Sequence, residues 1–243
     1  MTTALIKLDE DELFIDPRPT TQAVAVYDNL RRDIRSGALA PGLPLRTEVL
    51  KSRYQTGVSP LREALARLAA EHLVTAEGKR GFRVAPVWKE DFHQLIAIRK
   101  DLEARALELS MAHGNDDWEA SIVSSYHKLT KTSPPGLVLD AEAEELRERR
   151  HRAIHHALLS ACGSHWLLRF CDQLTAHLER YRRIMTPRSK ITKKVAAAIE
   201  DEHKLLMESV IARDYARAWG VLDSHRDRTY TAIQSAFDQA AAD

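Results

Sequence analysis

Apolar residues recur at helical spacing along most of this chain. In the stretch TTQAVAVYDNLRRDIRSG they fall at Val24, Val26, Tyr27, Leu30 and Ile34, the three-to-four-residue recurrence of an amphipathic helix. This helix is predicted to open at a Thr cap and to close at Gly37. RTEVLKSRYQ is predicted to be a short helix with Thr47 as its cap. In SPLREALARLAAEHL, Ser59 is the expected cap, Pro60 the first helical residue, and Leu61, Leu65 and Leu68 the buried stripe.

Two alternating stretches follow this third helix. LVTAE and GFRVAP read as short strands, and GKRG between them reads as the turn of a hairpin. ALAPGLPL, between the first two helices, has the Gly and Pro content of a turn-rich connection. Helix, helix, helix and hairpin within about 65 residues predict a winged helix-turn-helix.

From residue 88 onward the pattern is helical, with short breaks at HGND and TSPPGLVL. This part is therefore predicted to be an all-α antiparallel helical bundle, and the fold class mainly α. The expected helices are about 89–113, 116–131, 140–162, 164–186, 190–212 and 214–240.

Charge divides the chain more sharply than its total suggests. The formal net charge is +1, yet residues 1–20 carry −3, residues 21–87 carry +5 and the remainder carries −1. Only His72 of the eleven histidines lies in the basic segment. We therefore expect a flexible acidic tail at 1–20 and two domains with different functions, a DNA-binding domain at 21–87 and an all-helical domain at 88–243.

The basic residues of the N-terminal segment lie where a winged helix meets DNA. Arg62 is near the start of the third helix, the end that enters a major groove, and Lys79 and Arg80 are at the hairpin tip. Double-stranded DNA is therefore the expected partner, bound by a homodimer on a two-fold operator. The full set of predicted DNA-contacting residues is Arg46, Arg53, Ser59, Arg62, Lys79, Arg80 and Gly81.

The run YDNLRRDIRSGALAPGLPL…LREALARLAAEHLVTAEGKRGFRVAP resembles the GntR family of bacterial transcription regulators. The resemblance implies that Ser59 and Arg62 touch DNA from the recognition helix, and Arg80 and Gly81 from the wing. The family usually has an arginine four positions before Arg62, whereas this chain has Val58. The operator is therefore expected to differ from the family norm at one base pair.

Histidines in the predicted bundle fall on or beside the buried arcs of three helices. His151 and His155 lie at the edge of the arc set by Ile154 and Leu158, His203 lies inside its arc, and His225 lies at the border of its own. Residues four apart on a helix lie on the same face, so His151 and His155 can coordinate one metal ion. A single interfacial histidine is more often a core residue, but four aimed at one interior favour a metal site.

The order H-x3-H, then EH, then a final histidine 22 residues on, resembles the FCD ligand-binding domain of the FadR-type branch of GntR regulators. The resemblance implies that residues 88–243 form an effector- and metal-binding and dimerisation domain. That branch commonly supplies an Asp and three His to a metal. His151 stands where the Asp would be, and His155, His203 and His225 match the three histidines. Neutral imidazoles leave a divalent ion its full charge, which favours Zn²⁺ or Ni²⁺ and an anionic ligand. The alternative ligand set omits His151.

Arg99 falls on the apolar arc of the helix expected at 89–113. Either it pairs with Glu103 one turn on, or it binds an effector carboxylate, and the two roles are compatible. The matching arginine of FCD domains stands in an R-x3-E motif. Three segments are most similar to the CsiR-type regulators of this branch, which respond to a glutarate-type dicarboxylate. The segments are SRYQTGVSPLREAL, GNDDWEA and CGSHWLL. A small carboxylate effector, with dicarboxylates included, is the expected partner.

Other residues of the second domain have plainer interpretations. Trp118, Trp166 and Trp219 are predicted to be core residues, and Arg182 and Arg183 either line the pocket or lie on the surface. The charge-dense run EAEELRERRHR is typical of a solvated helix face.

The leading hypothesis is a cytoplasmic, effector-responsive repressor without a membrane segment and without enzymatic activity. Two alternatives compete with it: a metallohydrolase using the histidines, and a DNA-binding protein whose metal is purely structural. HExxH, the usual zinc-hydrolase signature, is absent from the sequence, which counts against the metallohydrolase.

Overall fold

The computed structural model describes residues 21–78, 81–132, 140–185 and 193–240. These residues form two compact units. One contains the described residues up to Asp33 together with Gly42–Ala85, and the other contains Ile34–Pro41 with the chain from Pro86 onward. The segment Ile34–Pro41, expected in the N-terminal domain, thus groups with the helical unit.

The first unit contains three helices and a small sheet. Helix α1 is Gln22–Ser36, of which residues 34–36 group with the second unit, α2 is Thr47–Tyr54 and α3 is Val58–Ala70. The strands are β1 (Pro44–Leu45), β2 (Val74–Ala76) and β3 (Phe82–Val84), in the antiparallel order β1-β3-β2. The predicted hairpin is confirmed, with Val74 opposite Val84. The third strand, β1, lies in the stretch expected to be only a connection, because its two residues pair with the distant β3.

The helix ends follow local chemistry, with two corrections. Thr21 caps α1, since its hydroxyl accepts a hydrogen bond from the Val24 amide at 3.3 Å, and Gly37 after the helix has φ +83°. The α3 N-cap is Gly57 and not Ser59, so Pro60 is the third helical residue. Proline is tolerated there because first-turn amides have no partner within the helix. Similarly, Arg46 and not Thr47 is the N-cap of α2.

The predicted stripe of α3 forms the core of the first unit. Leu61, Leu65 and Leu68 are at most 1% exposed, and Leu30 of α1 is fully buried. At about 1.5–3 kcal/mol for each large apolar side chain, this burial is the main stabilising term of the unit.

The second unit is all helical, as predicted. Its helices agree with the expected ones to within about three residues at each end. They are α4 (Lys89–His113), α5 (Asp116–Thr130), α6 (Ala141–Leu159), α7 (His165–Met185), α8 (Lys193–Ile211) and α9 (Tyr215–Ala240). The fold class of a winged helix-turn-helix followed by a helical bundle is confirmed.

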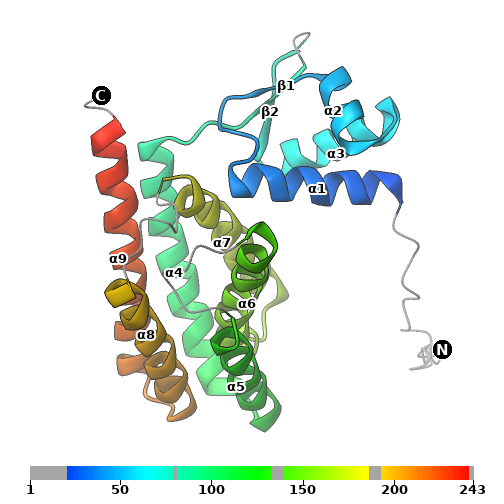
Figure 1. The fold of residues 1–243 in the computed structure, drawn as a ribbon. Coiled ribbons are helices and arrows are strands. Elements are labelled where there is room, and N and C mark those ends of the chain that lie inside the picture. The colour runs from blue at the N-terminus through cyan, green and yellow to red at the C-terminus, as the bar shows by residue number, and fades with distance from the viewer. Residues whose placement is uncertain (1–20, 79–80, 133–139, 186–192, 241–243) are drawn as a thin grey trace, which may run out of the picture. The chain divides into compact units, whose positions relative to one another are not determined.

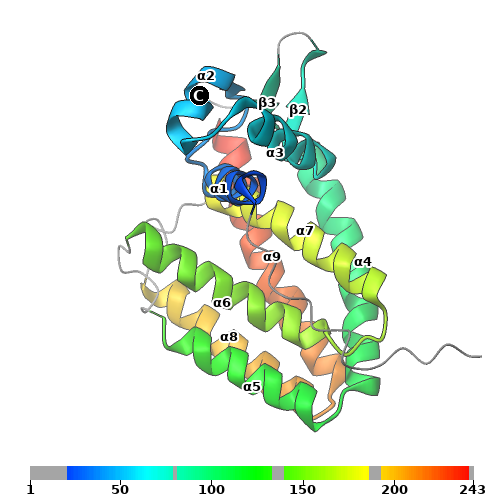
Figure 2. The ribbon, with the colours of Figure 1, turned by 90° about the vertical axis from the view of Figure 1, so that its right-hand side faces the viewer.

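Within this unit α4 is central and packs on α6, α7 and α9, while α5 packs on α6 and α8. Figure 2 shows α5, α6 and α8 running side by side. One apolar cluster includes Leu107, Ile122, Leu158, Leu206 and Leu222 from five helices. No helix in the described ranges is both long and apolar enough to cross a membrane.

Trp118 fixes α5 against α6. It is 5% exposed, and its indole Nε1–H donates to the Ala157 carbonyl oxygen at 2.8 Å. Its ring lies so close to Gly114 that a Cβ there would come within 2.0 Å of it, so glycine is required. Trp118 is therefore a core residue as predicted, whereas Trp166 is 61% exposed and that prediction was wrong.

Candidate metal centre

The histidine pair of α6 lies on one face of a well-capped helix. Asp140 caps α6 by accepting a hydrogen bond from the Ala143 amide at 2.7 Å. One helical turn separates His151 from His155, and their Nε2 atoms are 3.2 Å apart. Two imidazole nitrogens bound to one ion at about 2.0–2.1 Å lie about 3 Å apart, so the pair has the spacing of two ligands of one metal.

The other two histidines are oriented by partners on their own or a neighbouring helix. His203 Nδ1 lies 2.7 Å from the Ile199 carbonyl oxygen, which can only accept, so the ring proton is on Nδ1. His225 Nδ1 lies 3.0 Å from the Glu202 carboxylate. Both contacts leave Nε2 with its lone pair, the arrangement in which a metal-binding histidine donates its other N–H to a fixed acceptor.

The four rings converge from three helices. One nitrogen from each of His151, His155, His203 and His225 lies within 4.8 Å of the others. Among the described residues, the buried Nε2 of His203 has no hydrogen-bond partner, and neither has Nδ1 of His155. A buried polar nitrogen without a partner is costly, and a bound cation would satisfy it. The donor set and its orphaned nitrogen therefore fit a divalent metal.

The electrostatic environment keeps these imidazoles neutral. Burial and, after it, the neighbouring His225 together lower the pKa of His203 to about 3. Burial, followed by the other histidines, also lowers the pKa of His151 and His155 well below its ordinary value. Only the neutral imidazole is a metal ligand, so this environment suits coordination at neutral pH.

A pocket adjoins the histidines and encloses ≈ 500 Å³, including its open mouth. Its lining combines three of the histidines with four arginines, one glutamate and a few neutral side chains. The lining residues are Arg99, His151, Arg152, His155, Thr175, Leu178, Glu179, Arg182, His225, Arg226, Thr229 and Tyr230.

One wall of the pocket holds a buried charge cluster. The Glu103 carboxylate, 1% exposed, pairs with Arg99 at 3.0 Å and also with Arg226. Arg99 further donates to the Tyr230 hydroxyl at 3.3 Å. Burial lowers the pKa of Arg226 even though Glu103 raises it. Two guanidinium groups thus share one carboxylate, which leaves a buried positive charge beside the pocket for an anion to neutralise.

The pocket shows which residues the sequence patterns missed. The pairing of Arg99 with Glu103 is confirmed, but Arg226 was not identified, although it directly follows His225. The run EAEELRERRHR was wrongly interpreted as a solvated face, because Glu148 is only 3% exposed and pairs with Arg182. Arg152, in the same run, lines the pocket.

The predicted DNA-contacting residues lie in the first unit. Ser59 and Arg62 are exposed on the first turns of α3, next to Val58, which is 44% exposed. Arg46 is exposed at the start of α2. Arg53 is also exposed and pairs with Asp33 at 2.7 Å.

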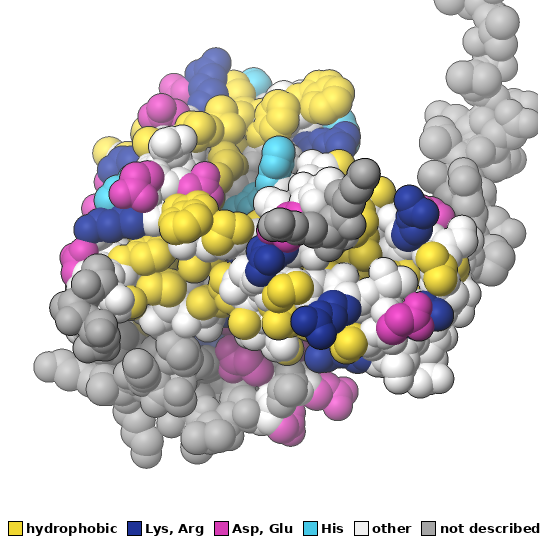
Figure 3. All heavy atoms as spheres, turned by 90° about the horizontal axis from the view of Figure 1, so that it is seen from above, with side chains coloured by type: hydrophobic (Ala, Val, Ile, Leu, Met, Phe, Trp, Pro, Cys, Tyr) yellow, Lys and Arg dark blue, Asp and Glu magenta, His cyan; other side chains and the backbone are white. Residues whose placement is uncertain are grey.

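The wing is described only in part. Gly81, at the base of the hairpin turn, has φ +90°, and Lys79 and Arg80 lie outside the described residues, as does the tail 1–20. On the face drawn in Figure 3, basic and acidic side chains are interspersed among hydrophobic ones.

Known proteins resemble both halves of the chain. Residues 22–84 match the model of bacterial regulatory proteins of the gntR family, and residues 94–228 match the FCD domain. The HTH-type transcriptional repressor GlaR of Escherichia coli (strain K12) is 37% identical over 212 residues, 86% of this chain and 94% of that protein. An uncharacterized HTH-type regulator, BphR of Paraburkholderia xenovorans (strain LB400), is 36% identical over 230 residues, 92% of each chain.

Among solved structures, E. coli McbR/YncC has the same fold, with a TM-score of 0.73 and 19% identity over 89% of this chain and 99% of that one. The family models and relatives describe transcriptional regulators and not enzymes, which decides against the metallohydrolase alternative. The chain belongs to the GntR family of bacterial transcription regulators and carries an FCD domain.

Proposed function

We propose that this regulator is a repressor whose affinity for its operator is changed by a small carboxylate effector bound next to a divalent metal. The observation that carries the proposal is the convergence of four histidines, with the His203 Nε2 atom buried and unpartnered among the described residues. When bound, the metal supplies a positive centre that attracts a carboxylate oxygen. The similarity to GlaR, which is named a transcriptional repressor, supports repression over activation.

Different residues of the protein would bind the metal and the anion. His155, His203 and His225 hold the metal, and His151, the most exposed of the four, either completes the set or stands beside it. Arg99 and Arg226 orient the anion by charge-assisted hydrogen bonds from the wall of the pocket. Zn²⁺ and Ni²⁺ suit an imidazole-rich site without a carboxylate ligand.

DNA recognition is assigned to exposed residues of the first unit. Arg62 reads base edges from α3, and Ser59, Arg46 and Arg53 contact the backbone or neighbouring bases, with Lys79, Arg80 and Gly81 contributing from the wing. A single recognition helix reads too few base pairs for specificity. We therefore propose a homodimer on a two-fold operator.

The test combines metal and DNA binding. The operator is first selected by the purified protein from a random DNA pool, and its dissociation constant is then measured with and without glutarate in the zinc-loaded protein. The proposal expects a glutarate-dependent change that disappears in His203→Ala, while glutarate-free operator binding persists. Equal responses in the wild type and His203→Ala would exclude the metal from the regulation. If none of a panel of small mono- and dicarboxylates alters operator affinity, the effector proposal fails.

The ligand set is tested separately. If His151 is a neighbour and not a ligand, His151→Ala keeps stoichiometric zinc, and if it is a ligand, zinc affinity falls as it does in His155→Ala. Isothermal titration of the metal-free variants with zinc measures both.

A further inference from the structure

One buried carboxylate in α7, that of Glu179, binds residues on two sides at once. Both of its oxygens accept hydrogen bonds from Arg152 Nη1, each at 2.8 Å, and one of them also accepts from Arg35. Arg183 approaches the carboxylate at 3.4 Å. Glu179 is 6% exposed, and both it and Arg152 line the pocket beside the histidines.

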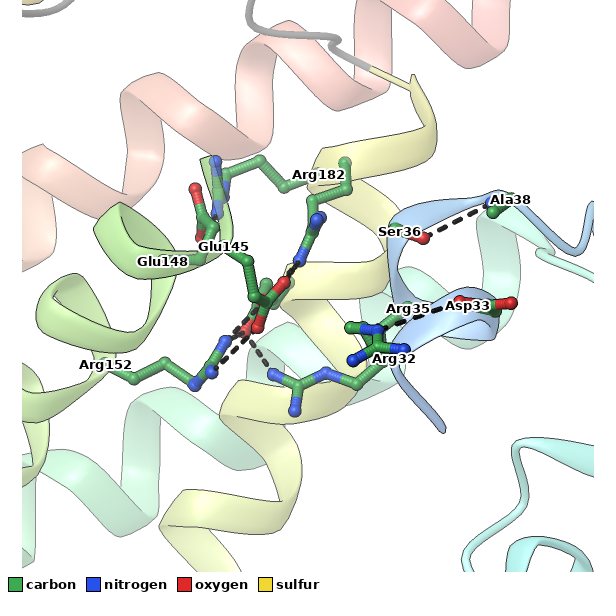
Figure 4. Close-up of polar contacts among 11 residues, drawn as sticks. Arg32, Asp33, Arg35, Ser36, Ala38, Glu145, Glu148, Arg152 and Arg182 are labelled. Carbon is green, nitrogen blue, oxygen red and sulfur yellow. Dashed lines mark hydrogen bonds and ion pairs between the residues drawn. The ribbon is translucent and has the colours of Figure 1, made fainter. Parts of the chain in front are cut away.

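This contact belongs to a larger ion network between α6 and α7. Glu145 of α6 pairs with Arg152 at 3.5 Å and with Arg183 at 2.9 Å, and Glu148 pairs with Arg182. Figure 4 shows Glu148 of α6 beside the side chain of Arg182, and Arg152 and Glu145 pointing from α6 toward α7. With Glu179 and Arg35 included, four arginines face three glutamates. Arg152, Glu179 and Arg182 of this network also line the pocket.

Arg35 brings the end of α1 into the same network. It lies in the last turn of α1 and is 8% exposed. The residues of α1 up to Asp33 belong to the first unit, whereas Ile34–Pro41 belong to the helical unit. An α-helix transmits a change at one end along its length, since its hydrogen bonds fix every residue to the next turn. The carboxylate of Glu179 thus joins a pocket residue to the helix that continues into the DNA-binding unit.

We propose that Glu179 is the positioning residue through which the pocket controls α1, an inference that rests on the proposed function. An anionic effector competes with Glu179 for Arg152, because both need the same guanidinium donors. When Arg152 binds the effector, Glu179 loses its hydrogen bonds from Arg152 and keeps those partners that remain, Arg35 and Arg183. Its ion pair with Arg35 then becomes stronger. The end of α1 is then fixed more firmly, and the operator affinity of the attached unit changes. Coupling of this kind requires that each site bias a shared element, and Glu179 is that element.

The experiment mimics the effector by a substitution that removes the guanidinium of Arg152 from Glu179. Operator affinity is measured by fluorescence anisotropy for Arg35→Gln, Arg152→Gln and the double variant, with DNA selected by the wild type from a random pool. We expect the two substitutions to be coupled by at least about five-fold in the dissociation constant. In a Glu179→Gln background the same cycle should show no coupling. Arg183→Gln is the matched control, because it removes a guanidinium from the same carboxylate without touching the pocket lining.

Amide hydrogen exchange gives a second readout that needs no DNA. Exchange at residues 34–36 should slow in Arg152→Gln and accelerate in Glu179→Gln. The inference is overturned if Arg35→Gln and Arg152→Gln change operator affinity independently of each other. It is also overturned if Arg35→Gln is coupled equally strongly to Arg183→Gln, because the ion network would then have only a structural role. Arg152→Lys replaces Arg152→Gln if the latter does not fold. If the wild type selects no operator, the proposed function fails, and the exchange data alone decide on the role of Glu179.

Discussion

The buried charge cluster of α4 makes a quantitative prediction about Glu103→Gln. Glu103 is 1% exposed and pairs with both Arg99 and Arg226, so the substitution removes the carboxylate and leaves two buried guanidinium groups facing an amide. At about 4 Å and an effective dielectric of about 20, each lost pair contributes about 4 kcal/mol of Coulomb energy. The amide oxygen still accepts one hydrogen bond, and water from the adjoining pocket solvates the arginines. We therefore expect the free energy of unfolding to fall by about 3–5 kcal/mol, the usual cost of removing one partner of a buried pair.

Urea unfolding followed by tryptophan fluorescence measures this loss in the relevant unit. All four tryptophans lie beyond residue 86, so the signal reports on the helical unit alone. The matched control is Glu108→Gln on the same helix, where the partner is Arg105 at 2.6 Å and both side chains are more than half exposed. The control should change stability by less than about 0.5 kcal/mol. Equal losses for Glu103→Gln and Glu108→Gln would refute the claim that Glu103 compensates a buried charge.

Three further predictions concern other parts of the molecule. Glu202→Gln removes the charged acceptor that orients His225. The zinc dissociation constant, measured by competition with a chelator, should therefore rise about 10–100-fold. An unchanged constant would show that the carboxylate does not support zinc binding. Arg62→Ala should weaken binding to the selected operator by about 1–3 kcal/mol with little effect on unrelated DNA, and an equal loss on both would make Arg62 a backbone contact. Burial alone would raise the pKa of Glu148, but the neighbouring arginines, Arg182 foremost, together outweigh it and the pKa is lowered. Its contribution to stability is therefore full above the unfolded-state pKa of about 4.5 and is lost as the pH falls through the folded-state value. The stability difference between the wild type and Glu148→Gln should accordingly shrink below about pH 4.5, and a difference that stays constant in urea unfolding down to pH 3 would contradict this.

The fold was predictable because its information is local. Helical spacing of apolar residues placed every helix of the described chain, and alternation placed the hairpin. Strand β1, Pro44–Leu45, was missed because two residues carry no period and become a strand only by pairing with distant residues. The N-cap of α3 was predicted at Ser59 because Ser59 and Pro60 are strong signals for the start of a helix. In the structure the helix begins two residues earlier than this prediction, and Gly57 is the extended residue before it.

The site was predictable only in part. His203 and His225 could be found because an imidazole on an apolar arc must face the interior. Arg152 and Glu179 could not be found in this way, since charged residues in polar runs are usually solvated. Their burial depends on partners from another helix, and only the packing of α6 on α7 brings those partners together.

Metal content after dialysis tests the central claim most directly. Elemental analysis by mass spectrometry would compare the zinc-loaded wild type with His203→Ala/His225→Ala and with His127→Ala/His165→Ala, whose two histidines are exposed and outside the cluster. The proposed centre predicts one metal ion per chain in the wild type and in the control variant, and none in His203→Ala/His225→Ala. One ion per chain in His203→Ala/His225→Ala would contradict it.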